Sequence, residues 1–165
     1  MVNFSKNTLN RRDVVKRILN KRANCLVVSG LGSPTYDVHA SGDNDKNFYM
    51  WGGMGGAAMV GLGLAIAQPE KIIIVITGDG EQLMGIGSLA TISVKKPKNL
   101  IVVVLDNEHF GETGMQQSHT FYNVDLVGVA AAVGCPNALL IRDENDVINL
   151  LEVIRTLSCF TFAVI

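Results

Sequence analysis

Apolar residues follow two alternating patterns along the chain. Five short runs rich in β-branched residues predict strands, and two of them, Lys71–Thr77 and Leu100–Leu105, are apolar at every interior position. Runs of this kind are typical of strands that are covered on both faces of a sheet. The other three predicted strands are Cys25–Ser29, Asn137–Ile141 and Phe160–Ile165.

Longer segments with helical patterns separate these runs. They predict helices at Thr8–Lys21, Ala57–Ala67, Gln82–Val94, Asp125–Val133 and Glu144–Leu157, with Asp125 and Asp143 as N-caps. Strands that alternate with helices indicate right-handed crossovers and a parallel sheet. The sequence contains no internal repeat, low-complexity tract or linker. We therefore expect residues 1–165 to form a single three-layer α/β/α domain with a mainly parallel sheet.

One apolar segment raises the question of a membrane span. No charged residue occurs over the 23 positions from Asn47 to Pro69. Glycines at positions 52, 53, 55 and 56 interrupt any helix at its start, which leaves Ala57–Ala67, 11 residues, as the unbroken candidate. A helix of that length is too short to cross a bilayer. Its small residues at positions 61, 63, 65 and 67 suit close packing on a sheet, so we predict that this helix is buried in protein.

Composition and charge exclude several classes of protein. The 165 residues are 48% hydrophobic and 18% charged, and 14 basic residues against 15 acidic ones leave a net charge of -1. No basic excess is available for nucleic acid or an anionic membrane. Three isolated cysteines without a C-x-x-C pair argue against a disulfide framework or a structural zinc site and fit a reducing compartment. The polar stretch Met1–Arg12 lacks the apolar region of a secretory signal, so we expect a cytoplasmic protein.

The first candidate for chemistry is the segment Thr77-Gly78-Asp79-Gly80-Glu81, between a buried strand and a helix. Glycines on both sides of an acid allow a sharp turn and a close approach of a ligand to the main chain. The amides of Gly80 and Glu81 would point from a helix N-terminus toward an anion such as phosphate. An acid at an anion site indicates a cation between them, and Mg²⁺ commonly takes a carboxylate together with substrate phosphates. A lone G-D-G could equally place Asp79 as a simple helix cap.

The second candidate is Asp106-Asn107, at the end of the next buried strand. Asn107 follows Asp79 by 28 positions (107 − 79), which is enough for a helix and a returning strand. In a parallel sheet, both strand ends then reach the same edge, where ligands bind. Taken alone, Asp106-Asn107 is an ordinary turn pair. The pairing with Asp79 makes an oxygen-ligand Mg²⁺ site the expectation.

This pair of motifs resembles the diphosphate-binding (PP) domain of thiamine diphosphate-dependent enzymes. The run GDGEQLMGIGSLATI…PKNLIVVVLDNEHFGETGMQ is most similar to the beta-type subunits of sulfopyruvate decarboxylase and the matching half of phosphonopyruvate decarboxylase. The resemblance covers essentially the whole chain and implies a 2-oxo acid decarboxylase subunit that uses thiamine diphosphate and Mg²⁺. It implies that Asp79, Asn107 and the main-chain oxygen of His109 bind the metal, with Gly78, Gly80, Glu81 and Gly111 around the diphosphate.

The resemblance also assigns two glycine-rich segments to the cofactor. In Gly52-Gly53-Met54-Gly55, the carbonyl of Gly52 would accept a hydrogen bond from the 4′-amino group, and Met54 would hold the two cofactor rings in a V. Most methionines are simply core filler. In the loop after the first strand, the Gly32 amide and the Ser33 hydroxyl would donate to phosphate. This loop reads S-P-T-Y where relatives would read S-R-E-L, and the missing arginine weakens the case for a strongly acidic substrate.

The segment from Asn107 to Asn123 is long for a loop and predicts a lid or a substrate loop. Within it, His119 is a candidate proton donor because its reference pKa lies near neutrality, although a surface histidine is about as plausible.

Thiamine enzymes take a catalytic glutamate from a separate PYR domain, which this chain has no room to hold. The resemblance therefore implies a PYR-type alpha subunit as partner, in an α2β2 or larger hetero-oligomer.

Three alternatives stay open. The chain could belong to a carboligase similar to acetolactate synthase or transketolase. It could be a nucleotide-binding module, since Gly30-Leu31-Gly32 begins a G-x-G pattern, which is weak support by itself. It could also be a non-catalytic scaffold subunit.

Overall fold

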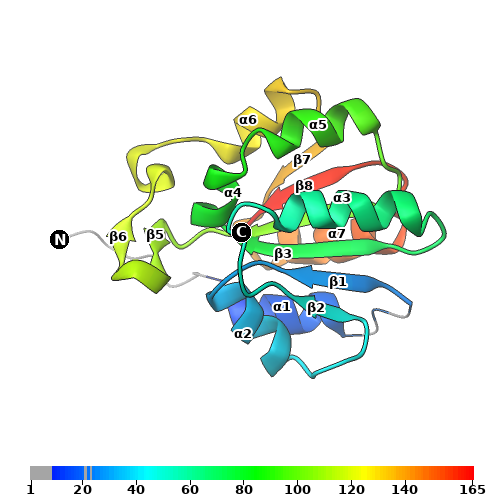
Figure 1. Ribbon diagram of the computed structural model, residues 1–165, viewed down its shortest axis with the longest axis horizontal. Helices are drawn as coiled ribbons and strands as arrows, with labels where there is room; N and C mark the ends of the chain where they lie inside the picture. The colour runs from blue at the N-terminus through cyan, green and yellow to red at the C-terminus, as the bar shows by residue number, and fades with distance from the viewer. Residues whose placement is uncertain (1–8, 21, 23) are drawn as a thin grey trace.

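The apolar runs of the sequence pair into a sheet of six parallel strands. The computed structural model describes residues 9–20, 22 and 24–165. The strand order is β2-β1-β3-β4-β8-β7, and every neighbouring pair is parallel. The bounds are β1 Leu26–Ser29, β2 Asn47–Tyr49, β3 Ile73–Gly78, β4 Leu100–Leu105, β7 Asn137–Leu140 and β8 Thr161–Val164. Both β3 and β4 lie in the interior of this sheet, as their uninterrupted apolar sequences predict, and Figure 1 shows β3 beside β1.

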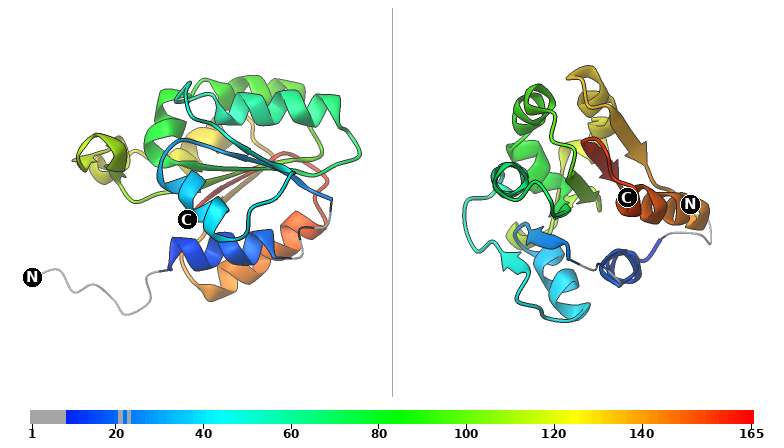
Figure 2. Two further views of the ribbon diagram at one scale, coloured as in Figure 1. Left: turned by 60° about the horizontal axis from the view of Figure 1, so that its bottom comes forward. Right: turned by 90° about the vertical axis from the view of Figure 1, so that its right-hand side faces the viewer.

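Helices cover both faces of the sheet, which confirms the expected three layers (Figure 2). The buried residues of α3, α5 and α6 join the same hydrophobic cluster as one face of the sheet, and those of α1, α2 and α7 join the other. Successive residues of β3 belong to alternate clusters: Ile73 and Val75 to one, and Ile74 and Ile76 to the other. The helices are α1 Arg11–Leu19, α2 Ser33–Ala40, α3 Ala57–Ala67, α4 Asp79–Met84, α5 Ser88–Lys95, α6 Leu126–Ala132 and α7 Glu144–Arg155.

The structure confirms most predicted elements and both N-caps. Asp125 accepts the main-chain N–H of Gly128, and Asp143 forms a capping box at the start of α7. The prediction for the first helix included Thr8 and Lys21, which lie outside the described residues. Outside the segment from Asn107 to Asn123, two elements were missed: β2, a three-residue edge strand, and α2, which has Pro34 in its first turn.

The predicted helix Gln82–Val94 is wrong, because the chain breaks there into α4 and α5. The break lies at Gly85, where a Cβ atom would stand only 2.1 Å from the main-chain oxygen of Gly55. Gly55 itself has a φ of +91°, a conformation that favours glycine. The two main chains approach each other so closely that neither residue can carry a side chain, and the helix restarts at Ser88.

The prediction that α3 is buried in protein holds for one side of the helix only. A Cβ atom on Gly61 would stand 2.3 Å from Val75 Cγ2, so small residues do let the helix pack closely on the sheet. Gly63, in contrast, has open space beside it, and Met59 and Ile66 are exposed. A helix that is apolar all round yet half exposed needs another apolar surface to cover it.

The segment from Asn107 to Asn123 is folded rather than a bare loop. It contains an antiparallel pair, β5 His109–Phe110 and β6 Gln116–Gln117, and two 3-10 turns, η1 Gly111–Thr113 and η2 His119–Tyr122. Figure 1 shows this hairpin standing out from the edge of the domain next to α4.

Two sequence-based questions find direct answers. None of the described helices is long and apolar enough to span a membrane. All three cysteines are free thiols, with Cys25 and Cys135 buried. Burial raises the pKa of both buried thiols.

Candidate functional site

A cavity of about 300 Å³ lies where the central strands end. It is lined by the last residues of β3 and β4, the start of α2, the start of α4 and the β5–η1 hairpin. Ligands of parallel α/β sheets bind at this edge, because loops from several strands converge there. Of the residues expected at a cofactor site, the cavity is lined by Ser33, Met54, Gly78, Asp79, Gly80, Glu81, Asn107, His109 and Gly111.

Asp79 is the most unusual group of the cavity. Its side chain is 2% exposed, and no ion pair joins it to any residue that the structure describes. Burial raises its pKa, and the nearby charge of Asp106 raises it further, while hydrogen bonds from Ser118 and from main-chain amides lower it. A buried carboxylate in this state carries a negative charge without a counter-charge, which a bound cation would supply.

Hydroxyl groups hold Asp79 in place. Ser118, which is fully buried, donates a hydrogen bond from Oγ to Asp79 Oδ2. Thr120 Oγ1 lies 2.8 Å from Asp106 Oδ1 and 3.4 Å from Asp79 Oδ2, so it stands between the two carboxylates. Both hydroxyls come from the hairpin segment that follows β4. These two contacts could not be predicted from the sequence, because serine and threonine in a polar loop carry no distinctive signal.

Asn107 and His109 line the cavity together with Asp79. Asn107 Oδ1 accepts the main-chain N–H of His109 at 3.1 Å, and His109 Nδ1 lies 2.8 Å from the main-chain oxygen of Asn107. These contacts fix the local conformation just beyond β4. Carboxylate, amide and main-chain oxygens form a donor set that suits Mg²⁺. No cluster of three or more His, Cys, Asp or Glu side chains that could hold a metal occurs in the described parts of the chain. A metal bound here would therefore also need oxygen atoms from a bound molecule as ligands.

Glu81 has a structural role that the sequence did not reveal. Its carboxylate is 4% exposed and accepts the main-chain N–H of Leu31 at 2.8 Å and that of Ala57 at 3.3 Å. It thus joins the loop after β1 and the start of α3 to α4. The prediction for this residue concerned its main-chain amide, and the side chain turns out to brace three segments around the cavity.

The loop after β1 meets the hairpin at Gly32. This residue has a φ of +73°, and a Cβ atom on it would stand 2.6 Å from Glu112 Oε1. Ser33 begins α2 and lines the cavity, while Gly32 is absent from the lining. Gly32 therefore allows the close approach of the hairpin, and whether its amide binds phosphate stays a prediction.

The glycine-rich segment before α3 reaches the cavity only through Met54. Met54 is 39% exposed, and Gly52 and Gly53 lie outside the lining, in an exposed stretch beside Trp51. His119 is also exposed and outside the lining, and its ring is nearly perpendicular to that of Phe110. The roles predicted for Gly52, Gly53 and His119 remain predictions.

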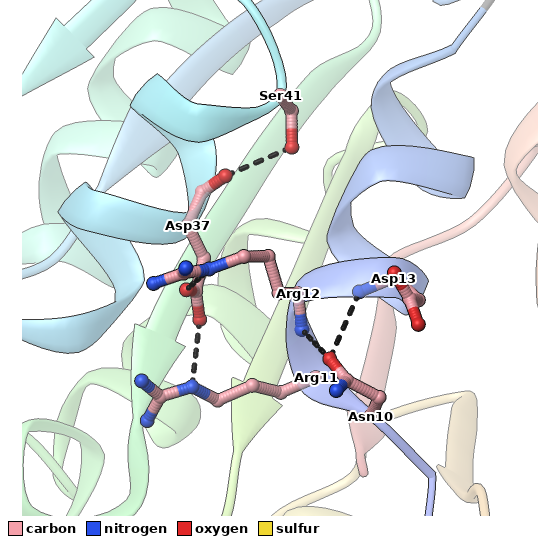
Figure 3. Close-up of polar contacts among 6 residues, drawn as sticks. All are labelled: Asn10, Arg11, Arg12, Asp13, Asp37 and Ser41. Carbon is pink, nitrogen blue, oxygen red and sulfur yellow. Dashed lines mark hydrogen bonds and ion pairs between the residues drawn. The ribbon is translucent and has the colours of Figure 1, made fainter.

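Arg11 also lines the cavity, although the sequence analysis did not single it out. It comes from the first turn of α1 and contacts the buried Asp37 of α2, as does its neighbour Arg12 (Figure 3). The three residues are brought together by the packing of α1 on α2, which no local sequence pattern predicts.

Comparison with known proteins identifies the kind of domain. Residues 35–164 match the family described as thiamine pyrophosphate enzyme, C-terminal TPP binding domain. The chain is 43% identical over 125 residues to the beta subunit of sulfopyruvate decarboxylase from Methanocaldococcus jannaschii, covering 75% of this chain and 66% of that one. It is 44% identical over 108 residues to phosphonopyruvate decarboxylase from Streptomyces hygroscopicus, covering 66% of this chain and 26% of that one.

A solved structure supports the fold. Benzoylformate decarboxylase from Polynucleobacter necessarius superposes with a TM-score of 0.75 at 17% identity, covering 94% of this chain and 32% of that chain. The chain thus spans less than two thirds of each of these proteins. The family match favours thiamine diphosphate over a dinucleotide as the ligand of this domain. The chain belongs to the thiamine pyrophosphate enzyme family, as a C-terminal-type TPP-binding domain.

Proposed function

We propose that this chain is the cofactor-binding subunit of a thiamine diphosphate- and Mg²⁺-dependent 2-oxo acid decarboxylase. One observation carries the proposal. Asp79 and Asn107, which follow the paired strands β3 and β4, line one cavity, and the buried carboxylate of Asp79 has no cationic partner among the described residues. A divalent cation would neutralise that charge and bind a diphosphate in turn.

The residues that would hold the cofactor surround the cavity. Asp79, Asn107 and the main-chain oxygen of His109 would bind Mg²⁺. Donors in the Gly32–Ser33 loop and the Gly78–Glu81 turn would hold the diphosphate, with Gly111 beside it, and the Gly52–Met54 segment would hold the pyrimidine. When bound, the cofactor supplies an electron sink for the carbon–carbon bond that breaks as CO₂ leaves.

A partner subunit would complete the site. The relative from Methanocaldococcus jannaschii is itself named a beta subunit. Large apolar side chains are exposed in the cavity lining, as at Met54 and Met84, and on α3, as at Met59 and Ile66. Exposed apolar side chains in such number are typical of an interaction surface. The proposed partner is a PYR-type alpha subunit that provides the catalytic glutamate, in an α2β2 or larger assembly.

Binding of the cofactor is the first test. Thiamine diphosphate with Mg²⁺ should raise the melting temperature of the protein, because a ligand that binds only the folded state stabilises it. NAD serves as the control ligand and should leave the melting temperature unchanged. Stabilisation by NAD and none by thiamine diphosphate would contradict the proposal.

Product analysis is the second test. The protein, purified together with its partner, should release CO₂ and an aldehyde from sulfopyruvate or phosphonopyruvate, with pyruvate as the comparison substrate. Condensation of two substrate molecules into a longer product would instead identify a carboligase. Activity that survives Asp79→Ala would favour a scaffold role for this chain.

A further inference from the structure

The cavity contains one arginine whose presence the proposed metal and cofactor ligands do not explain. Arg11 is the only lysine or arginine among the described residues that line it. Three acidic residues, Asp79, Glu81 and Glu112, line the same cavity. A cation placed among these carboxylates either neutralises one of them or binds an anion that enters from outside.

Arg11 is held by Asp37, which does not line the cavity. Arg11 Nε lies 2.9 Å from Asp37 Oδ2 in an ion pair, although that oxygen forms no hydrogen bond with a described residue, and Arg12 Nε donates a hydrogen bond of 3.1 Å to Asp37 Oδ1 (Figure 3). The Asp37 side chain is completely buried, whereas those of Arg11 and Arg12 are 41% and 59% exposed. Asp37 is therefore a buried negative charge that pairs with two guanidinium groups and accepts a hydrogen bond from that of Arg12.

The charges of this cluster do not cancel. One carboxylate faces two guanidinium groups, so the cluster carries a positive charge that Asp37 does not neutralise. Asp37 engages Arg11 through Nε, and no hydrogen bond from Arg11 Nη1 or Nη2 is formed with any described residue. These two nitrogens are the pair that binds a phosphate or carboxylate in the usual two-pronged manner.

We propose that Arg11, held beside Asp37 by an ion pair, is an anion-binding residue of the cavity that contacts a phosphate- or sulfonate-type group. Ser33 and Pro34, the first two residues of the helix that carries Asp37, line the same cavity as Arg11. The oxyanion could come from the diphosphate of the cofactor or from the acidic end of a substrate. This inference deepens the proposed function, but it can be tested without it, because inorganic pyrophosphate is a sufficient probe.

The chain offers a matched control for the test. Arg11→Gln and Arg12→Gln each remove one guanidinium from Asp37, yet only Arg11 lines the cavity. Calorimetric titration of the full protein with Mg²⁺-pyrophosphate should show about tenfold weaker binding for Arg11→Gln, the usual effect of losing a charge-assisted hydrogen bond. Arg12→Gln should bind within about twofold of the wild type, and Arg11→Lys should recover part of the loss because it keeps the charge.

Two further titrations identify the source of the anion. If the cofactor provides it, Arg11→Gln weakens thiamine diphosphate binding as much as pyrophosphate binding. If the substrate provides it, Arg11→Gln leaves both pyrophosphate and thiamine diphosphate binding unchanged, and KM rises for sulfopyruvate or phosphonopyruvate but not for pyruvate. If the wild-type protein binds pyrophosphate but not thiamine diphosphate, the proposed function is contradicted and this inference is not. Equal effects of Arg11→Gln and Arg12→Gln, or no effect of either on any of these ligands, would overturn the inference.

Discussion

Asp37 and Asp79 are both buried aspartates, and their surroundings differ in one respect. Asp37 is contacted by two arginines from α1, so its charge is more than neutralised. Asp79 is contacted by the hydroxyls of Ser118 and Thr120, and its nearest charge, Asp106, has the same sign. Hydroxyl donors satisfy the oxygen atoms of a carboxylate but leave its charge in place.

The difference separates a residue that stabilises the fold from one that is prepared for a ligand. An ion pair inside the protein offsets part of the cost of burying a charge. A buried carboxylate without one has a raised pKa, a state that clusters at functional sites. Glu81 offers a third arrangement, in which main-chain N–H groups of two segments satisfy a buried carboxylate.

Of the two aspartate-to-asparagine exchanges, Asp79→Asn should have the larger effect. Asp79→Asn removes the charge that holds a cation, so thiamine diphosphate with Mg²⁺ should bind more than about a hundredfold more weakly, a loss of about 2.7 kcal/mol or more. Without cofactor, the same variant should melt at a higher temperature than the wild type at neutral pH, because an uncharged group is cheaper to bury. Thermal melts with and without the cofactor measure both effects, and unchanged binding would remove Asp79 from the metal site.

Glu81→Ala should destabilise the protein by about 3 kcal/mol in free energy of unfolding. It leaves the N–H groups of Leu31 and Ala57 without their acceptor, and each hydrogen bond to a charged group contributes about 1.5–3 kcal/mol. Urea unfolding measures the change. Glu81→Gln, which keeps one acceptor oxygen, is the control and should lose less; equal losses would show that the carboxylate does not brace the two segments.

In the cofactor-free protein, Asp37→Asn should lower the stability, whereas Asp79→Asn should raise it. It leaves two guanidinium groups without their counter-charge, and since both are partly exposed, the expected loss is about 1–2 kcal/mol in free energy of unfolding. Melting both asparagine variants side by side tests the contrast. A shift of the same direction in both would show that the two aspartates are equivalent after all.

Ser118→Ala should have the smallest effect of these variants, a change in how cofactor binding depends on pH. The hydrogen bond from Ser118 lowers the pKa of Asp79, so removing it raises that pKa further. A raised pKa in the folded state favours the protonated form, so the stability it brings is present at low pH and lost as pH rises through it. Cation binding requires the ionised form, so the acid limit of Mg²⁺-dependent cofactor binding should move to higher pH, with about threefold weaker binding below neutrality.

The matched control for this variant is Ser93→Ala. Ser93 is another buried serine, on α5, and its hydroxyl has no hydrogen-bond partner among the described residues. Titrations of cofactor binding from acid to neutral pH should show the shift for Ser118→Ala alone. If both variants or neither shift the acid limit, Ser118 does not tune Asp79.

The amino-acid sequence alone determined the elements whose pattern is local. The strand Leu100–Leu105 and the helix Ala57–Ala67 begin and end where they were predicted to. The strand is an uninterrupted apolar run and the helix is bounded by glycines, so the ends of both can be read from the local sequence. Asp79 and Asn107 could be assigned to one edge for a similar reason, since strand direction in a parallel sheet follows from the βαβ order.

Tertiary structure alone decided the contacts that join distant segments. Gly55 against Gly85 breaks a helix, Ser118 reaches Asp79 from 39 residues away, and Arg12 reaches Asp37 from 25 residues away. Each depends on how two elements pack against each other, and a glycine, a serine or an arginine looks the same in the sequence whether or not it meets such a partner. Local patterns record which face of an element is apolar, whereas the partner of a polar group is fixed only when the chain has folded.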